Sequence, residues 1–390
     1  MPNSPASHVT GPTPAVQISG IELFLLDLPL HEPFVASHGE TLTRTIAVVR
    51  VTGDGVIGWG ECSALPAATY TAESAAGSFA ALADKLGPRL IGRTMTPQAV
   101  VPLLFDGPEV ALPMAASALE MAVLDASLRS TAQSLASWLG TTRATVPAGV
   151  SLGLADPGET VAKAVDLAAE GYNRLKVKVQ PGHDLELASA IRAALPDIEL
   201  QLDANGAYGA EAIDHVLAII ECGIDAFEQP FAKADERAAI ELIGLLAQSG
   251  RPPIPVVADE AVESTKDAIG LLERGVMTGL SIKPGRVGGL IAAVNIHDLC
   301  RAKGLPATAG GMLETGLGRH ALAALAGLDG FTLTGDLSPA GRWLAADPWP
   351  DLVLGQGRIA IHQGPGVAPD PDEDVLERFT VERCRVSNAP

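Results

Sequence analysis

The sequence predicts an α/β protein in which a (β/α) barrel follows a smaller α+β unit. Strand-like and helical segments alternate from residue 146 onward, about eight strands can be counted there, and ionisable residues recur where those strands end. Alternating units of this number suit a barrel better than an open, doubly wound sheet. A dinucleotide-binding fold lacks support, because no Gly-x-Gly-x-x-Gly follows the first of these strands.

Composition narrows the class of protein. The 390 residues are 47% hydrophobic, enough for a large core, and no apolar run reaches the length of a membrane span. A net charge of −19 disfavours nucleic-acid binding through a basic surface. The four cysteines (Cys62, Cys222, Cys300 and Cys384) show no paired spacing, which fits free thiols in a reducing compartment. We therefore expect a cytoplasmic protein without nucleic-acid or membrane partners.

The first unit is expected to span residues 16–145, after a disordered tail over residues 1–15. The tail is rich in Ser, Pro, Thr and Ala and lacks the basic start and apolar centre of a signal peptide. Apolar patterns predict three strands, at 16–30, 46–51 and 55–61. Alanine-rich periodicity then predicts helices at 71–86, 97–104 and 111–139. Strands followed by helices make an α+β unit.

The barrel is expected to span residues 146–345. Its predicted strands are 146–152, 174–179, 199–203, 226–228, 256–259, 279–282, 306–309 and 331–334. Its predicted helices are 157–170, 183–194, 209–222, 235–248, 264–274, 289–303 and 316–326. The remaining segment, 346–390, is rich in Pro and Asp and has short apolar runs at 352–354 and 358–361. We expect this segment to pack back on the first unit.

Two lysines stand two residues apart in a run that otherwise has the pattern of a buried strand. Side chains alternate along a strand, so Lys176 and Lys178 project from the same face. Burying them together is costly, because desolvation and mutual repulsion both oppose two neighbouring ammonium groups. An exposed edge strand would explain the pair without any function.

Ionisable residues recur at or just after the predicted strand ends. They are Lys176, Lys178, Asp203, Glu228, Asp259 and Lys283. From Lys178 the steps are 25, 25, 31 and 24 residues, each close to one βα unit. In a barrel this spacing collects the groups at the mouth where barrel enzymes have their active sites.

Three carboxylates on consecutive strands would repel one another unless a cation lay between them. Oxygen ligands suit a hard divalent ion, and Mg²⁺ is favoured because it leaves positions open for substrate oxygens. Zinc is disfavoured, since no histidine lies at these strand ends. As an alternative, Asp203 and Asp259 could each cap the following helix, but Glu228 before Gln-Pro fits that role poorly.

The second and sixth strands of a closed barrel face each other, so Lys178 and Lys283 would flank a substrate held at the acids. A metal-bound carboxylate acidifies its α-proton through an enediolate intermediate, and a neutral lysine can then remove that proton. Lys176 would lower the pKa of Lys178 by its like charge. A Schiff-base role for a lysine would need a carbonyl substrate and would not require three acids.

Several motifs are similar to those of a known family. They are Lys-Val-Lys, Leu-Asp-Ala-Asn, Phe-Glu-Gln-Pro, Ala-Asp-Glu, Ile-Lys-Pro-Gly-Arg-Val-Gly-Gly, Gly-Gly-Met-Leu-Glu-Thr-Gly-Leu-Gly-Arg and Gly-Trp-Gly-Glu-Cys. Together they resemble the muconate-lactonising branch of the enolase superfamily, and within it the N-acylamino acid (N-succinylamino acid) racemase/o-succinylbenzoate synthase family. The resemblance implies an α+β enolase-type capping domain and a modified (β/α)7β TIM-type barrel.

The resemblance also implies roles for individual residues. Asp203, Glu228 and Asp259 would bind Mg²⁺, with Mn²⁺ or another divalent ion as a substitute. Lys178 and Lys283 would be the acid/base pair, with Lys176 beside them. The residues expected near the substrate or the metal are Ser151, Asn205, Gly311, Met312 and Arg286. Loops at 34–45 and 63–70 would close over an acyl group, and relatives commonly form homo-oligomers from dimers to octamers.

Racemisation of N-acyl amino acids, especially N-succinyl ones, is the activity that this resemblance favours. Arg286 supports it by lying three residues after Lys283, where a cation could tune that amine, although a plain salt bridge would explain it equally well. The close alternative is o-succinylbenzoate synthase, which dehydrates 2-succinyl-6-hydroxy-2,4-cyclohexadiene-1-carboxylate in menaquinone synthesis. One chain could catalyse both reactions.

Other activities have less support. Muconate cycloisomerisation ranks third, and a non-catalytic barrel should have lost a ligand or a lysine, whereas none is missing. Dipeptide epimerases of this branch typically carry Asp-x-Asp near the last strand, where this chain has only Asp336. The mandelate racemase branch uses a late histidine base, but His297 and His320 fall within predicted helices.

Overall fold

The computed structural model describes residues 13–36, 39–106, 112–141, 143–250 and 253–387. Residues 1–12 of the tail expected over residues 1–15 therefore lie outside the described part of the chain. Thr13 is buried, and its hydroxyl accepts hydrogen bonds from Gln98 at 2.9 Å and from Trp138 at 3.0 Å. Within the described ranges, no helix combines the length and apolarity needed to cross a membrane.

The first unit is built on an antiparallel sheet. Its long strands are β1 (Val16–Ala36), β2 (Gly39–Gly53) and β3 (Val56–Cys62), and β4 (Thr94–Met95) and β15 (Thr380–Arg385) each pair with β1. Asp54 and Gly55 have φ values of 50° and 78° in the turn between β2 and β3. Two successive residues with positive φ are what a tight hairpin requires, and Asp-Gly supplies them.

Helices cover one face of this sheet. They are α1 (Ala75–Ala81), the π-helix η1 (Leu82–Leu86), the 3₁₀ turn η2 (Gly87–Arg89), α2 (Pro97–Leu104), α3 (Pro113–Ser130) and α4 (Leu135–Leu139). Helix α3 lies directly on β3, where a Cβ at Gly60 would stand 2.0 Å from the Ala118 carbonyl oxygen. The helix predicted over 111–139 is broken between α3 and α4, where Ala132 has a φ of 52°.

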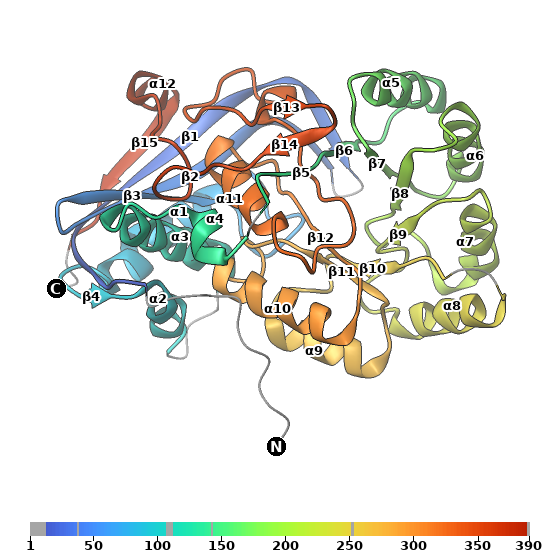
Figure 1. The fold of residues 1–390 in the computed structure, drawn as a ribbon, viewed down its shortest axis with the longest axis horizontal. Coiled ribbons are helices and arrows are strands. Elements are labelled where there is room, and N and C mark those ends of the chain that lie inside the picture. The colour runs from blue at the N-terminus through green and yellow to red at the C-terminus, as the bar shows by residue number, and fades with distance from the viewer. Residues whose placement is uncertain (1–12, 37–38, 107–111, 142, 251–252, 388–390) are drawn as a thin grey trace.

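The second unit is a curled sheet of seven parallel strands in chain order (Figure 1). They are β6 (Gly149–Leu152), β7 (Arg174–Lys178), β8 (Glu199–Asp203), β9 (Ala226–Glu228), β10 (Val256–Ala258), β11 (Gly279–Ile282) and β12 (Ala307–Ala309). The interleaved helices are α5 (Pro157–Ala169), α6 (Asp184–Ala194), the 3₁₀ turn η3 (Ala210–Ala212), α7 (Ile213–Ile220), α8 (Glu236–Gln248), α9 (Thr265–Arg274), α10 (Leu290–Lys303) and α11 (Gly316–Ala326). The predicted capping domain and barrel are confirmed.

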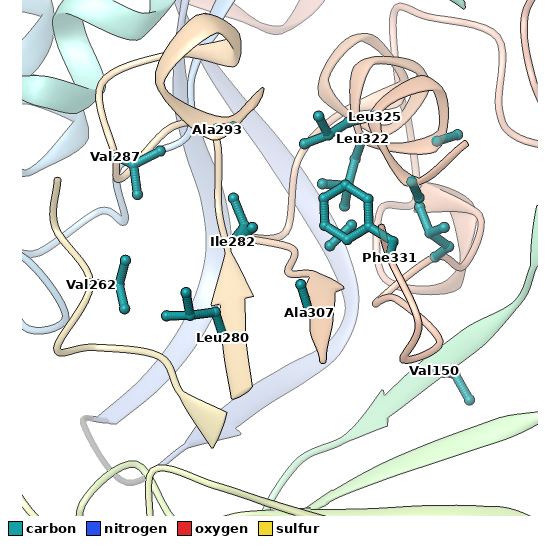
Figure 2. Packing of buried hydrophobic residues seen from close by; sticks show 14 of the residues in the cluster. Val150, Val262, Leu280, Ile282, Val287, Ala293, Ala307, Leu322, Leu325 and Phe331 are labelled. Carbon is teal, nitrogen blue, oxygen red and sulfur yellow. The ribbon is translucent and has the colours of Figure 1, made fainter. Parts of the chain in front are cut away.

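The eighth predicted strand, 331–334, is wrong as a strand. The segment makes spaced hydrogen bonds to β12, from Leu333 N to Ala307 O at 3.1 Å and from Asp336 N to Ala309 O at 2.9 Å. Phe331 turns into the buried cluster beside Leu322 and Leu325 of α11 (Figure 2). The segment closes the gap between β12 and β6 without the regular pairing that defines a strand.

The predicted strand 146–152 is two strands in the structure, because β5 (Thr145–Pro147) leaves the barrel before β6 begins. Strand β5 pairs with β14 (Arg358–Ala360), which pairs in turn with β13 (Leu354–Gly355). The 3₁₀ turn η4 (Ala340–Arg342) precedes this small sheet, and α12 (Glu373–Phe379) leads into β15 on the first sheet. The C-terminal segment therefore contacts both units.

Candidate active site

Three acids converge at the carboxyl ends of β8, β9 and β10. Asp203 and Glu228 are the last residues of their strands, and Asp259 directly follows β10. Ligand oxygens of the three lie within 4.8 Å of one another, and each residue is fully buried. Buried carboxylates at such distances repel one another strongly, and oxygen-only ligation suits a hard divalent cation. The residues present therefore fit a divalent metal site.

Lys176 is the cation at the centre of this group. Its Nζ lies 2.6 Å from Glu228 Oε1, 3.0 Å from Asp203 Oδ2 and 3.2 Å from Asp336 Oδ2. Burial alone would lower the pKa of Lys176, but the surrounding carboxylates raise that pKa well above its usual value. Lys176 is therefore held as an ammonium ion. The alternative of an exposed edge strand is wrong, because every residue of β7 is buried.

Lys178 lies on the β8 side of the acids. Its Nζ donates hydrogen bonds of 2.7 Å to Asp203 Oδ2 and to Asn205 Oδ1. Asn205 has a φ of 45°, its backbone N–H reaches Asp203 at 3.0 Å, and its amide nitrogen donates to Glu260 at 2.5 Å. Asn205 thus fixes the positions of Lys178 and Asp203 relative to each other.

Lys283 lies on the opposite side, against Asp259. Its Nζ donates to Asp259 Oδ2 at 2.8 Å and to the Tyr70 hydroxyl at 2.7 Å. Tyr70 comes from the capping domain, and its hydroxyl donates to the same Asp259 oxygen at 2.7 Å. The two candidate bases therefore approach the acids from opposite sides, and one of those sides includes the capping domain.

Arg286 is buried behind this cluster rather than in the wall of a cavity. Its guanidinium pairs with Asp259 Oδ1 at 2.7 Å, donates to the Val262 carbonyl at 2.8 Å, and also contacts Tyr70. Only 1% of the residue is exposed. The expectation that Arg286 contacts substrate is therefore corrected, because both ends of its guanidinium are already bound by protein groups.

A cavity of about 400 Å³ opens above the acids. Of the residues predicted from sequence, it is lined by Lys176, Lys178, Lys283, Ser151, Gly311 and Met312. From the expected loop 63–70 it is lined by Leu65 and Tyr70, whereas the side chains of residues 34–42 in the other loop lie outside the described part of the chain. The volume suits a small organic substrate.

Arg174 has no role among the predicted site residues, and Asp336 stands out in the sequence only as the one acid at the Asp-x-Asp position of dipeptide epimerases. Asp336 accepts hydrogen bonds from Arg174 at 2.5 Å, from Ser151 at 2.9 Å and from Lys176 at 3.2 Å. Burial raises the pKa of Asp336, but Lys176 and Arg174 outweigh it and hold that pKa well below its usual range. Arg174 stands two residues before Lys176, so the alternation used for the lysines already placed it on the same face.

The single charge of Lys176, 2.6 Å from Glu228, does not balance the carboxylates around it. Burial raises the pKa of Glu228 to about 8; Lys176 opposes this rise, and the negative charges of Asp203, Asp259 and Asp336 add to it. For Asp203, burial also raises the pKa, but Lys176 and Lys178 bring it well below its usual range. A divalent cation would supply the missing charge at Glu228, which agrees with the metal site inferred from the distances.

Two family profiles match the chain. A profile described as "Enolase C-terminal domain-like" matches residues 159–375, and one described as "Mandelate racemase / muconate lactonizing enzyme, N-terminal domain" matches residues 20–140. These ranges correspond to the curled sheet with its helices and to the capping unit. The first match alone covers more than half of the chain.

Curated proteins of two activities are similar over nearly the whole chain. An N-succinylamino acid racemase of Amycolatopsis sp. is 37% identical over 96% of this chain and 100% of its own length. An o-succinylbenzoate synthase of Bacillus subtilis is 34% identical over 94% of this chain and 98% of its own. A solved structure described as a member of the enolase superfamily from Listeria innocua superposes with a TM-score of 0.89, at 29% identity over 96% of this chain and 100% of that one.

The fold, the three converging acids and the flanking lysines agree with these matches. The three acids lie within reach of one cation, and Lys176, Lys178 and Lys283 line one cavity at the same end of the barrel. The chain belongs to the enolase superfamily, in its muconate-lactonising branch, and is an enzyme of metal-dependent α-proton abstraction.

Proposed function

We propose that this enzyme racemises N-acyl amino acids, with N-succinyl amino acids as the preferred class. The observation that carries the proposal is the pair of amines in one cavity: Lys178, at the end of β7, and Lys283, just after β11, lie on opposite sides of the acid group. A racemase needs one group to remove the α-proton from one face and another group to return a proton to the other face. The Amycolatopsis racemase is the relative with 37% identity.

Asp203, Glu228 and Asp259 are the proposed ligands of Mg²⁺, and Mn²⁺ or another divalent ion is a proposed substitute. The bound cation would supply positive charge to the substrate carboxylate and so make the α-proton more acidic. Oxygen ligands alone favour Mg²⁺ over softer metals. Lys176 contacts two of these acids and remains charged, so it orients them and keeps a positive charge beside Lys178.

Substrate contacts are proposed for three cavity residues. Ser151, Gly311 and Met312 lie in the wall shared with the two lysines. Asn205 acts through Lys178 and Asp203, and Arg286 acts through Asp259, because their side chains hydrogen-bond to these site residues. The substrate is thus a small carboxylate whose α-carbon lies between the amines and whose acyl group extends toward the capping domain.

The second candidate is o-succinylbenzoate synthesis, with or without racemisation. The Bacillus subtilis relative carries that name at 34% identity, and both reactions begin with loss of a proton α to a carboxylate. They differ in whether a proton returns to the opposite face or a hydroxyl group leaves. Two amines in one cavity favour racemisation, because elimination does not require a second base.

The test uses the purified enzyme in D₂O with Mg²⁺. Each enantiomer of a panel of N-succinyl amino acids is incubated, and α-deuterium incorporation is followed by NMR together with chiral analysis. In parallel, the cyclohexadiene carboxylate precursor is followed for formation of o-succinylbenzoate. We expect exchange and racemisation of the succinyl amino acids. Turnover of the precursor alone would replace the proposal by the second candidate, and inertness toward both would refute each.

The same material tests the expected assembly. We propose a homo-oligomer between a dimer and an octamer, and light scattering on the purified enzyme gives its mass. A monomeric mass would contradict the proposed homo-oligomer but would not affect the proposed reaction.

A further inference from the structure

Two barrel helices receive the caps of their amino ends from the capping domain. Helices α10 and α11 follow the loops that carry Lys283 and Met312, and neither has a side-chain hydrogen bond from its own N-cap residue, Gly289 or Thr315. The first backbone N–H groups of a helix have no partner within the helix, so other groups must satisfy them. In both helices a buried glutamate of the other domain accepts some of these N–H groups, and in α11 Asp347 accepts that of Gly316 at 2.7 Å.

Glu61 of β3 caps α11. Its carboxylate accepts the Thr315 N–H at 3.2 Å and the Gly318 N–H at 3.3 Å, and it also accepts the Thr315 hydroxyl. Glu61 is the acid of Gly-Trp-Gly-Glu-Cys, a motif for which the chemistry of proton abstraction gives no role. Beside it, Arg44 of β2 donates to the carbonyl oxygens of Leu313 at 2.8 Å and Met312 at 3.3 Å, so the loop before α11 is held from the same side.

Glu120 of α3 caps α10. Its carboxylate accepts the Ile291 N–H at 3.1 Å. A Cβ at Gly289 would stand only 2.2 Å from Glu120 Oε1, so the close approach requires glycine there. The loop back to the site is short and bonded, from Val287 N to Lys283 O at 3.1 Å and from Gly289 N to Pro284 O at 2.8 Å.

We propose that Glu61 and Glu120 are positioning residues for proton transfer, through which the capping domain sets the place of Met312 and of Lys283 in the site. This proposal rests on the proposed function for its kinetic readouts. Glu120 acts on the amine of Lys283, whereas Glu61 acts on the wall formed by Gly311 and Met312. A misplacement of one reacting group by about 1 Å can cost about 100-fold in rate.

The kinetic test compares Glu120→Ala, Glu61→Ala and a matched control. Asp125→Asn is the control, because Asp125 lies on α3, is fully buried and accepts two backbone N–H groups, those of Trp59 and Val367, away from the active-site loops. In Glu120→Ala, α-deuterium exchange of the enantiomer served by Lys283 should fall about 10-fold or more relative to the other. In Glu61→Ala, KM should rise more than kcat falls, whereas the control should change neither the exchange ratio nor KM.

Glu120→Gln keeps an oxygen acceptor and should restore most of the exchange ratio. If an alanine variant does not fold, the Glu→Asp variant at the same position replaces it in every comparison. Aspartate shortens the side chain by one methylene group and so weakens the contact with the helix N–H groups. Variants whose exchange ratio and KM match those of Asp125→Asn would overturn the proposal, since the glutamates would then contribute stability alone.

A readout without substrate separates this proposal from the proposed function. Backbone hydrogen exchange of the free enzyme should accelerate at residues 283–291 in Glu120→Ala and at 310–319 in Glu61→Ala, beyond the change in Asp125→Asn. Acceleration spread evenly over the barrel would overturn the positioning role, even if the enzyme racemises. Local acceleration in a protein that exchanges no α-proton would instead refute the proposed function and leave the interdomain caps established.

Discussion

The two amines of the site lie in different surroundings. Lys178 is held by Asp203 and Asn205, both from the next strand and its loop within the barrel. Lys283 is held by Asp259 of the barrel and by Tyr70 of the capping domain, and the loop behind it ends at the Glu120 cap. Among the described residues, the groups that hold Lys178 come from the barrel, whereas those that hold Lys283 come from both domains.

This difference assigns distinct tasks to the two units. The barrel brings the acids and one base together by the regular geometry of its parallel strands. The capping domain adds the groups that orient the second base and close the cavity. Substitutions on the Lys283 side should therefore respond to changes in the capping domain, while those on the Lys178 side should not.

The largest effect is expected from removing either amine. Lys178→Ala and Lys283→Ala should each lower racemisation of both enantiomers by about 1000-fold, since every turnover uses both bases. Each variant should still exchange the α-proton of the enantiomer that the remaining lysine serves. Chiral analysis and NMR in D₂O measure the two rates, and exposed Lys266→Ala serves as the matched control. Normal racemisation in either variant removes that lysine from the mechanism.

Lys176 provides the next test, because it contacts three acids between the two sides of the site. Lys176→Met keeps the length of the side chain but leaves Asp203, Glu228 and Asp336 without their shared cation. The free energy of unfolding should fall by about 3 kcal/mol in the absence of metal, as expected when one partner of a buried ion group is lost. Added Mg²⁺ should recover part of this loss, measured by chemical unfolding. An equal loss with and without Mg²⁺ would argue against a metal at these acids.

Tyr70→Phe sharpens the comparison with a smaller change. The variant loses the hydroxyl that bonds Lys283 and Asp259 but keeps the ring, whose centroid lies 4.7 Å from the Lys283 ammonium. Exchange of the enantiomer served by Lys283 should slow by about 10-fold, the usual worth of a hydrogen bond to a charged group. Exchange through Lys178 should be unchanged. Equal slowing of both enantiomers would show that Tyr70 serves the whole site rather than one side.

The last effect is a slope rather than a loss of activity, and it concerns pH and the interdomain caps. Burial raises the pKa of Glu61 and of Glu120 from 4.5 to about 8. Between these values the native state binds more protons than the unfolded state, so the free energy of unfolding falls as pH rises, by up to about 1.4 kcal/mol per pH unit for each group. This contribution is complete below the unfolded pKa and is lost as pH rises through about 8. Urea unfolding of Glu61→Gln, Glu120→Gln and the wild type should show flatter slopes for the variants. Identical slopes would mean that neither group titrates in this window.

Much of the site could be predicted because it follows from local regularities. Lys176 and Lys178 share a face by strand alternation, and the spacing of the acids places them one βα unit apart. Arg286 shows where this reasoning reaches its limit. Its position three residues after Lys283 predicts a place near that amine, but sequence distance does not show that its guanidinium points to Asp259 and away from the cavity.

The order of strands and helices, the acids and lysines, and the face they share can all be predicted from sequence, because they depend on periodicities of two residues, 3.6 residues and one βα unit. Only the tertiary structure decided which groups neutralise them. Asp336 reaches Lys176 across 160 residues, and Tyr70 reaches Lys283 across 213. The wrong prediction of an eighth strand has the same cause. Residues 331–334 have a strand-like pattern, but whether they pair regularly depends on how β12 and β6, which are distant in sequence, are placed.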